Sequence, residues 1–172
     1  MSLIVEDGTG VVGAESYATE AQATAYFSNR GVAAWTAVVN KEAALRKATD
    51  YMVQNYRLAW KGSRVDPEQA LDWPRSGCYV SGYRLGKFSS DYLVPSNVVP
   101  NEVRNACIEL ALKTSSEDLN PDLTQQVLSE KVGPLMVTYS EHSPQYKQFR
   151  AVDMSLRHLL VGNTVTHQVL RS

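Results

Sequence analysis

Apolar residues recur at helical spacing in four separate stretches of the chain. The first stretch follows Thr19, which together with Gln22 forms a capping-box pattern that satisfies free amide groups at a helix start. We expect this helix to end at Gly31 and Trp35 to lie in the short turn that follows, with its ring over the core. The apolar face of this helix consists of Ala23, Tyr26 and Phe27.

A second helix is predicted to begin near Asn40, a good capping residue, and to run for about 15 residues as an amphipathic element. Its apolar stripe consists of Ala44, Leu45, Ala48, Met52 and Tyr56. A third helix is predicted to start at Pro100, which suits the first helical position, and to reach about Thr114. Its buried face consists of Val103, Ala106, Cys107, Leu110 and Ala111.

The fourth helix is expected over residues 149–160, before Gly162, and His158 would then lie in its last turn. Its apolar face consists of Val152, Leu156, Leu159 and Leu160. Before this helix, two short runs, 127–132 and 135–139, lie on either side of Gly133-Pro134. Two such runs around a turn pair predict a β-hairpin within residues 125–140.

Residues 58–99 show no regular pattern and are predicted to be a long loop. Six aromatic residues within it need to be covered: Trp60, Trp73, Tyr79, Tyr83, Phe88 and Tyr92. Either the loop folds back on its own domain, or a neighbouring chain covers it.

These elements predict a mainly α fold, a small helical bundle with an embedded β-hairpin, a long aromatic loop and extended N- and C-terminal tails. At 172 residues the chain is long enough for one domain without further stabilising links. We expect a single domain over residues 1–162, with the loop insertion at 58–99 and the hairpin at 125–140. Residues 163–172 are expected to form a flexible tail.

Composition narrows the classes of partner. The formal net charge is -1, so no overall field draws the chain to nucleic acid or to a membrane surface. No stretch reaches the length needed to cross a bilayer, and the first residues lack the pattern of a signal peptide. Cys78 and Cys107 fit no metal-ligand spacing and favour a reducing compartment, with Cys107 as a small buried residue.

Few residues indicate catalysis. Gly8 to Gly13 matches the G-x-G-x-x-G dinucleotide fingerprint, but no helix opens directly on it and no acidic residue follows about 20 positions later. A glycine turn in an N-terminal arm is the preferred interpretation. His142, His158 and His167 are not spaced as metal ligands. We therefore expect no enzyme, no catalytic residue, no cofactor and no metal.

Cationic and aromatic side chains are interspersed in the irregular region. Between residues 57 and 87, six Arg and Lys side chains stand against three carboxylates. Three interpretations are open: a loop packed by its own rings, a DNA-binding surface, and a protein interface, which we favour. The DNA-facing candidates are Arg57, Lys61 and Arg64. The interface candidates are Trp60, Trp73, Arg75, Tyr79, Tyr83, Phe88, Tyr92, Val165, Val169 and Leu170.

Five short blocks, in a fixed order from about Leu3 to Leu160, resemble a family of small tailed-phage proteins encoded in head-assembly regions. The blocks are Glu6-Asp7-Gly8-Thr9-Gly10, Leu45 to Tyr51, Trp73-Pro74-Arg75, Val99-Pro100 with its helix, and Ser129 to Gly133 with Tyr139. The family often carries the label "putative DnaT-like single-stranded DNA-binding protein". The hairpin block also resembles that of head–tail connector, or adaptor, proteins.

This resemblance implies a structural virion protein at the neck, made in the host cytoplasm. As an adaptor it would form a dodecameric ring under the portal, join the capsid to the tail and line the DNA channel. Its partners would be the portal protein, a tail or stopper protein, further copies of itself and genomic DNA without sequence specificity, with no membrane. The alternative is a single-stranded DNA-binding accessory protein of phage replication or packaging.

Overall fold

The computed structural model describes residues 2–85, 88–121, 129–132, 135–138 and 148–162. These ranges contain four α-helices, α1 (Glu20–Ser28), α2 (Lys41–Tyr56), α3 (Asn101–Lys113) and α4 (Arg150–Leu156), and one 3-10 helix, η1 (Ala33–Ala37). The strands form three antiparallel pairs, β1 (Ser63–Arg64) with β2 (Arg75–Ser76), β3 (Tyr79–Leu85) with β4 (Phe88–Leu93), and β5 (Ser129–Val132) with β6 (Leu135–Thr138). The prediction of a small, mainly α protein is confirmed.

Side-chain caps define the starts of α1 and α2, as predicted. The Thr19 hydroxyl accepts a hydrogen bond from the Gln22 amide, and the Gln22 side chain accepts one from the Thr19 amide. The Asn40 side chain accepts a hydrogen bond from the Ala43 amide at 2.9 Å. The third helix starts one residue later than predicted, because Pro100 has extended backbone and lies at the cap position.

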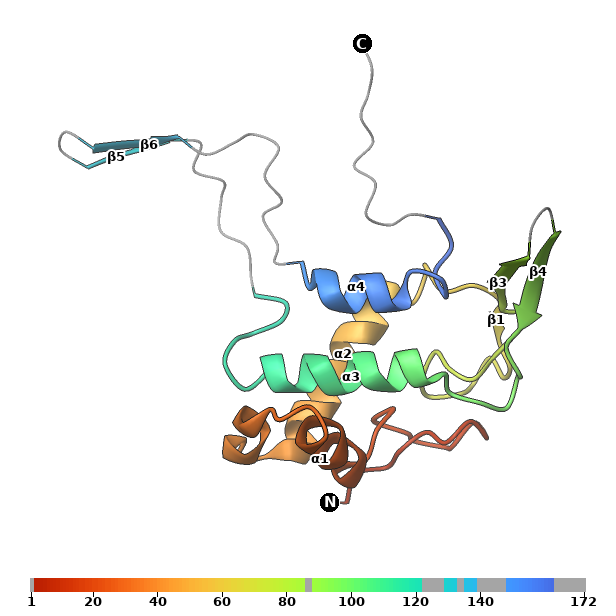
Figure 1. The fold of residues 1–172 in the computed structure, drawn as a ribbon. Helices are drawn as coiled ribbons and strands as arrows, with labels where there is room; N and C mark the ends of the chain where they lie inside the picture. The colour runs from red at the N-terminus through yellow and green to blue at the C-terminus, as the bar shows by residue number, and fades with distance from the viewer. Residues whose placement is uncertain (1, 86–87, 122–128, 133–134, 139–147, 163–172) are drawn as a thin grey trace, which may run out of the picture.

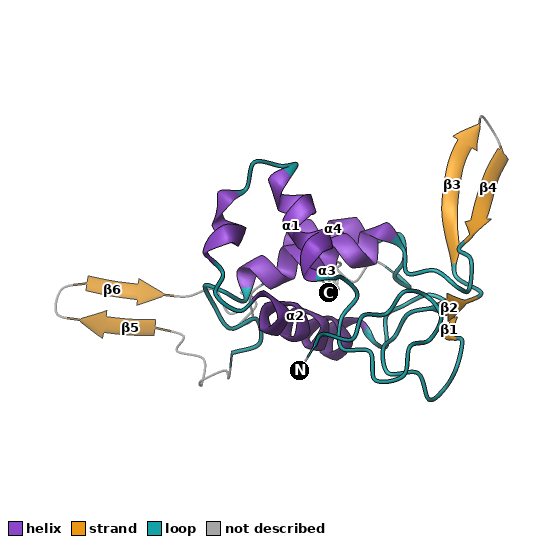
Figure 2. Ribbon diagram, turned by 90° about the horizontal axis from the view of Figure 1, so that it is seen from below, coloured by secondary structure: helices purple, strands orange, loops and turns teal. Residues whose placement is uncertain are grey.

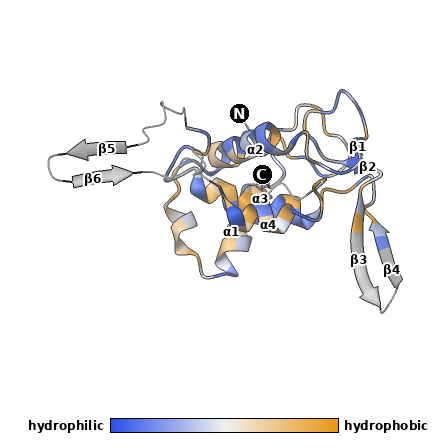
Figure 3. Cartoon of the chain, turned by 90° about the horizontal axis from the view of Figure 1, so that it is seen from above, coloured by the Kyte–Doolittle hydropathy of each residue, from blue (hydrophilic) through white to orange (hydrophobic). Residues whose placement is uncertain are grey.

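The core lies where α2 packs against α3 and α3 packs against α4 (Figure 1). Hydrophobic residues, orange in Figure 3, gather where α1, α3 and α4 meet. All the apolar residues predicted for the buried faces of α2 and α3 are buried. Cys107 is among them, and burial raises the pKa of its thiol. Trp35, in η1, is 1% exposed and packs on Phe27, which confirms its predicted place over the core.

The fourth helix is shorter than predicted, because the chain leaves the helix to pair with the segment after α2. The Lys61 amide donates to the Leu159 carbonyl at 2.9 Å, and Trp60 and Leu160 form an antiparallel bridge. Leu159 and Leu160 are nevertheless buried, as expected. The prediction that His158 lies in the last helical turn is wrong, since the helix ends at Leu156.

The N-terminal segment is folded, so the prediction of an extended N-terminal tail is wrong. The buried carboxylate of Glu6 accepts hydrogen bonds from the amides of Gly8, Gly10 and Val11 at 2.8–2.9 Å. These three bonds satisfy the backbone of the predicted glycine turn within one compact loop. Gly8 has a φ of +112°, and a Cβ there would collide with the backbone of Asn97. The turn therefore docks closely against the segment before α3.

The region 58–99 is not a long irregular loop, and this prediction is also wrong. It contains β1–β2 and the hairpin β3–β4, which projects from the helical core (Figure 2). Its register pairs Tyr79 with Leu93 and Val80 with Tyr92, and it shifts between Ser81 and Arg84. This irregularity, together with the glycine and serines in the strands, interrupts the alternation that would have indicated the hairpin from sequence.

The predicted hairpin of residues 125–140 is confirmed for the strands β5 and β6, whose register runs from Ser129 opposite Thr138 to Val132 opposite Leu135. The predicted C-terminal tail, residues 163–172, lies outside the described residues. In the described part of the chain, no helix has the length and apolar character required to cross a bilayer.

Candidate functional site

Trp60 and Trp73 lie inside the chain, 3% and 0% exposed. Their rings meet edge to face with centroids 5.7 Å apart, and the ring of Tyr56 packs on Trp60 at the same distance. This corrects the expectation that the two tryptophans lie at a surface for a partner. At these positions the segment folds back on its own domain, which was one of the two alternatives.

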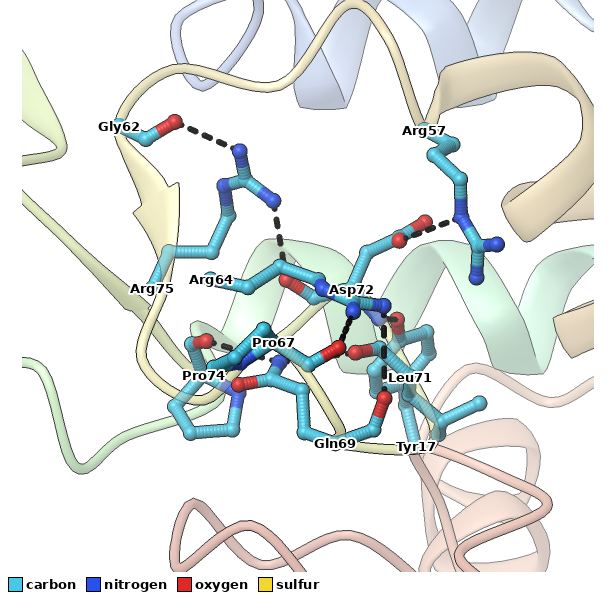
Figure 4. Close-up of polar contacts among 10 residues, drawn as sticks. All are labelled: Tyr17, Arg57, Gly62, Arg64, Pro67, Gln69, Leu71, Asp72, Pro74 and Arg75. Atoms are coloured by element: carbon cyan, nitrogen blue, oxygen red, sulfur yellow. Dashed lines mark hydrogen bonds and ion pairs between the residues drawn. The ribbon is translucent and has the colours of Figure 1, made fainter.

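Arg75 is also buried, 6% exposed, and it joins two parts of the segment after α2. Its guanidinium donates to three backbone carbonyls, that of Lys61 at 2.8 Å and those of Gly62 at 2.6 Å and Asp72 at 3.1 Å. Figure 4 shows the bonds to Gly62 and Asp72. Burial lowers the pKa of Arg75, although Asp72 opposes this effect. The expectation of a surface role for Arg75 is corrected as well, because its charge is used to hold the fold together.

Asp72 is 1% exposed and forms the second polar centre of the segment. Its Oδ1 accepts from Arg57 Nε at 2.9 Å, and its amide donates to the Tyr17 hydroxyl at 3.0 Å (Figure 4). Burial raises the pKa of Tyr17, so this phenol stays neutral. Asp72 Oδ2 and both indole nitrogens of Trp60 and Trp73 have no hydrogen-bond partner among the residues that the structure describes.

The three DNA-facing candidates all contact groups of this same chain. Arg57 binds Asp72, the Lys61 ammonium donates to the His158 carbonyl at 2.8 Å, and Arg64 donates to the Gln69 and Pro67 carbonyls. Arg57 remains exposed and the other two are half-buried. The stacking partners expected for them, Trp60 and Trp73, are not at the surface. The structure therefore does not bring cations and exposed rings together here.

The remaining aromatic candidates lie in the hairpin β3–β4. Tyr79 and Tyr92 are 55% and 60% exposed, and Leu93, which sequence reasoning missed, is 48% exposed. All three belong to the base of the hairpin. Tyr83 lies in β3 and Phe88 in β4, but their side chains are outside what the structure describes, as are Val165, Val169 and Leu170. The exposed pair Tyr79 and Leu93 at the hairpin base is the strongest candidate site for a partner, while Tyr92, the neighbour of Leu93 in β4, belongs to the opposite face.

A groove of about 610 Å³ lies between α3 and α4 and was also not expected from the sequence. Glu102 and Glu109 line one side, and Phe149 and Arg150 line the other. The Tyr26 hydroxyl donates to Glu109 Oε1 at 2.8 Å at the edge of the groove. In the described ranges, no group of three or more His, Cys, Asp or Glu residues could hold a metal ion.

These features define a class, a small mainly α protein whose candidate surface is a projecting hairpin. A family model described as "Putative DnaT-like ssDNA binding protein" matches residues 1–172, and the chain belongs to this family. No curated protein and no solved structure matches the chain.

Proposed function

We propose that this chain is a structural protein of a tailed-phage particle, a head–tail adaptor. In this role it forms a ring under the portal, joins the capsid to the tail at the neck and surrounds the DNA channel. Its contacts are with the portal, with a stopper or tail protein and with neighbouring copies. Genomic DNA passes nearby and is not read for sequence.

The observation that carries the proposal is the pair of hairpins that extend from the helical core. Each strand of β3–β4 and of β5–β6 contacts the other strand of its own hairpin. With any other described helix or strand these four strands make at most marginal contact. A two-stranded hairpin is marginally stable by itself in water and gains stability by packing on another surface. A subunit of an assembly supplies that surface from its neighbours.

The exposed side chains at the base of β3–β4 support the same function. Tyr79 and Leu93 lie directly opposite each other, both about half exposed. When a partner docks, tyrosine and leucine side chains at such a position lose apolar area accessible to water. Burial of this area stabilises the complex by roughly 25 cal/mol per Å². Aromatic residues are enriched at the cores of protein interfaces.

The deciding experiment is quantitative mass spectrometry of purified virions, with this chain measured against the portal protein. We expect a ratio close to that of two stacked rings, near one copy per portal subunit. Virions that contain portal but lack this chain would refute the adaptor function.

Single-stranded DNA binding is the second candidate function, and the description of the family favours it. The cations that would serve it, Arg57, Lys61 and Arg64, are bound to groups of the chain itself. We expect weak affinity for an oligothymidine, measured by fluorescence anisotropy at two salt concentrations. A strong affinity that falls steeply with salt and is lost in a variant that combines Arg57→Gln, Lys61→Gln and Arg64→Gln would favour this candidate. Circular dichroism of the variant checks that it remains folded.

A further inference from the structure

We propose that two copies of this chain join through their hairpins, β4 of one copy pairing with β6 of the next. This inference rests on the proposed adaptor function and names the contact by which the ring would close. The observation behind it is that the chain has two hairpins on opposite sides of the helical core, as all three views show (Figures 1–3).

The outer edge of β4 is open. The Val94 amide donates to the Cys78 carbonyl at 2.9 Å, and the register continues through Tyr79 opposite Leu93. Hydrogen-bonded and non-bonded pairs alternate in antiparallel strands, so the backbone groups of Leu93 and Asp91 point away from β3. β4 also lies on the side of the hairpin away from the helices (Figure 1). Its outward amides and carbonyls are therefore free to pair with another strand.

In the part of the chain that the structure describes, neither strand has the features that normally protect a sheet edge. Natural edge strands use proline, several charges or a covering element to prevent pairing with another chain. β4 contains one charged residue, Asp91, and no proline, while β6 (Leu135–Thr138) contains neither a charge nor a proline. β6 belongs to a two-stranded sheet, so no other strand among the described residues pairs with its outer edge.

The second copy is the occupant that this geometry favours. A surface that pairs with a different surface on the same chain gives a head-to-tail contact, and such a contact forms a ring when the rotation between successive copies closes. The described strands of each hairpin carry one acidic and one basic residue, Arg84 with Asp91 and Glu130 with Lys131, so pairing brings no net like charge together. A four-stranded sheet across the contact would remove the instability of each hairpin.

Two variants of the full-length chain test the contact from its two sides. Asp91→Pro removes an outward amide of β4, and Met136→Pro with Val137→Pro removes the pairing capacity of β6. The matched controls are Asp91→Ala and Met136→Ala with Val137→Ala, which keep every amide. Because the hairpins make little contact with the helical core, thermal unfolding of the core should be unchanged in all four. Self-association is measured by sedimentation velocity over a concentration series.

We expect the wild-type chain to associate with a dissociation constant below about 100 μM and each proline variant to associate at least tenfold more weakly. Each proline variant keeps one intact hairpin. A mixture of the two should therefore form a dimer with one copy of each, and nothing larger.

Three results would overturn the inference. They are a wild-type chain that stays monomeric, proline variants that associate as strongly as their alanine controls, and a mixture that forms no dimer. None of these results decides the adaptor function, which is tested by the ratio of this chain to the portal protein in purified virions. Conversely, absence of the chain from virions would refute the adaptor function whatever its self-association.

Discussion

Arg75 offers the sharpest test of how the segment after α2 is held. Its guanidinium donates to the carbonyls of Lys61, Gly62 and Asp72 at 2.6–3.1 Å while its side chain is 6% exposed. Arg75→Lys keeps the positive charge and most of the apolar stem. It removes the planar fork that reaches three acceptors at once.

The magnitude follows from the bonds that lysine cannot make. A hydrogen bond from a charged group contributes about 1.5–3 kcal/mol, and one ammonium in place of the fork loses at least two of the three. The Gly62 carbonyl lies in an exposed residue and regains a bond to water, which reduces the loss. We expect Arg75→Lys to lower the free energy of unfolding by about 2–4 kcal/mol.

The assay is urea unfolding followed by tryptophan fluorescence, which reports on the buried rings of Trp60 and Trp73. Arg157→Lys is the matched control, because Arg157 is exposed, and it should stay within about 0.5 kcal/mol of the wild type. If Arg75→Lys lowered the free energy of unfolding by less than about 1 kcal/mol, a single hydrogen bond would account for the whole effect. That result would refute the role of Arg75 in holding the segment through three bonds.

Two further predictions concern the N-terminal turn and alkaline pH. Gly8→Ala should lower the melting temperature much more than Gly10→Ala, because both glycines have positive φ but only Gly8 lies against the backbone of Asn97. Calorimetry measures both melting temperatures, and equal decreases would contradict this explanation. Burial raises the pKa of both Tyr17 and Tyr56, so the folded state keeps two protons that the unfolded state releases above about pH 10. Stability from these groups is fully present below that pH and falls above it, by about 1.4 kcal/mol per pH unit for each tyrosine. Urea midpoints between pH 9 and 11 measure the slope, and an unchanged slope in Tyr56→Phe would contradict the assignment.

Local patterns in the sequence determined the helical part of the fold. The caps at Thr19 and Asn40 and the apolar faces of α2 and α3 depend on residues within one or two turns of each other, so they can be read directly. The strands of β5–β6 were predictable for the same reason, since they flank the local turn pair Gly133-Pro134 and their register has no shift. The hairpin β3–β4 was missed because its register shifts between Ser81 and Arg84.

Only the tertiary structure decided which aromatic residues are available to a partner. Trp60 and Tyr92 look alike in the sequence, yet one is 3% exposed and the other 60%. The difference comes from residues far along the chain: Leu160 pairs with Trp60 in a bridge, and the Lys61 ammonium reaches the His158 carbonyl. Burial depends on such distant neighbours, which no local pattern specifies. The carboxylate of Glu6 is a similar case, because its place at the centre of a buried turn depends on the segment before α3 that covers it.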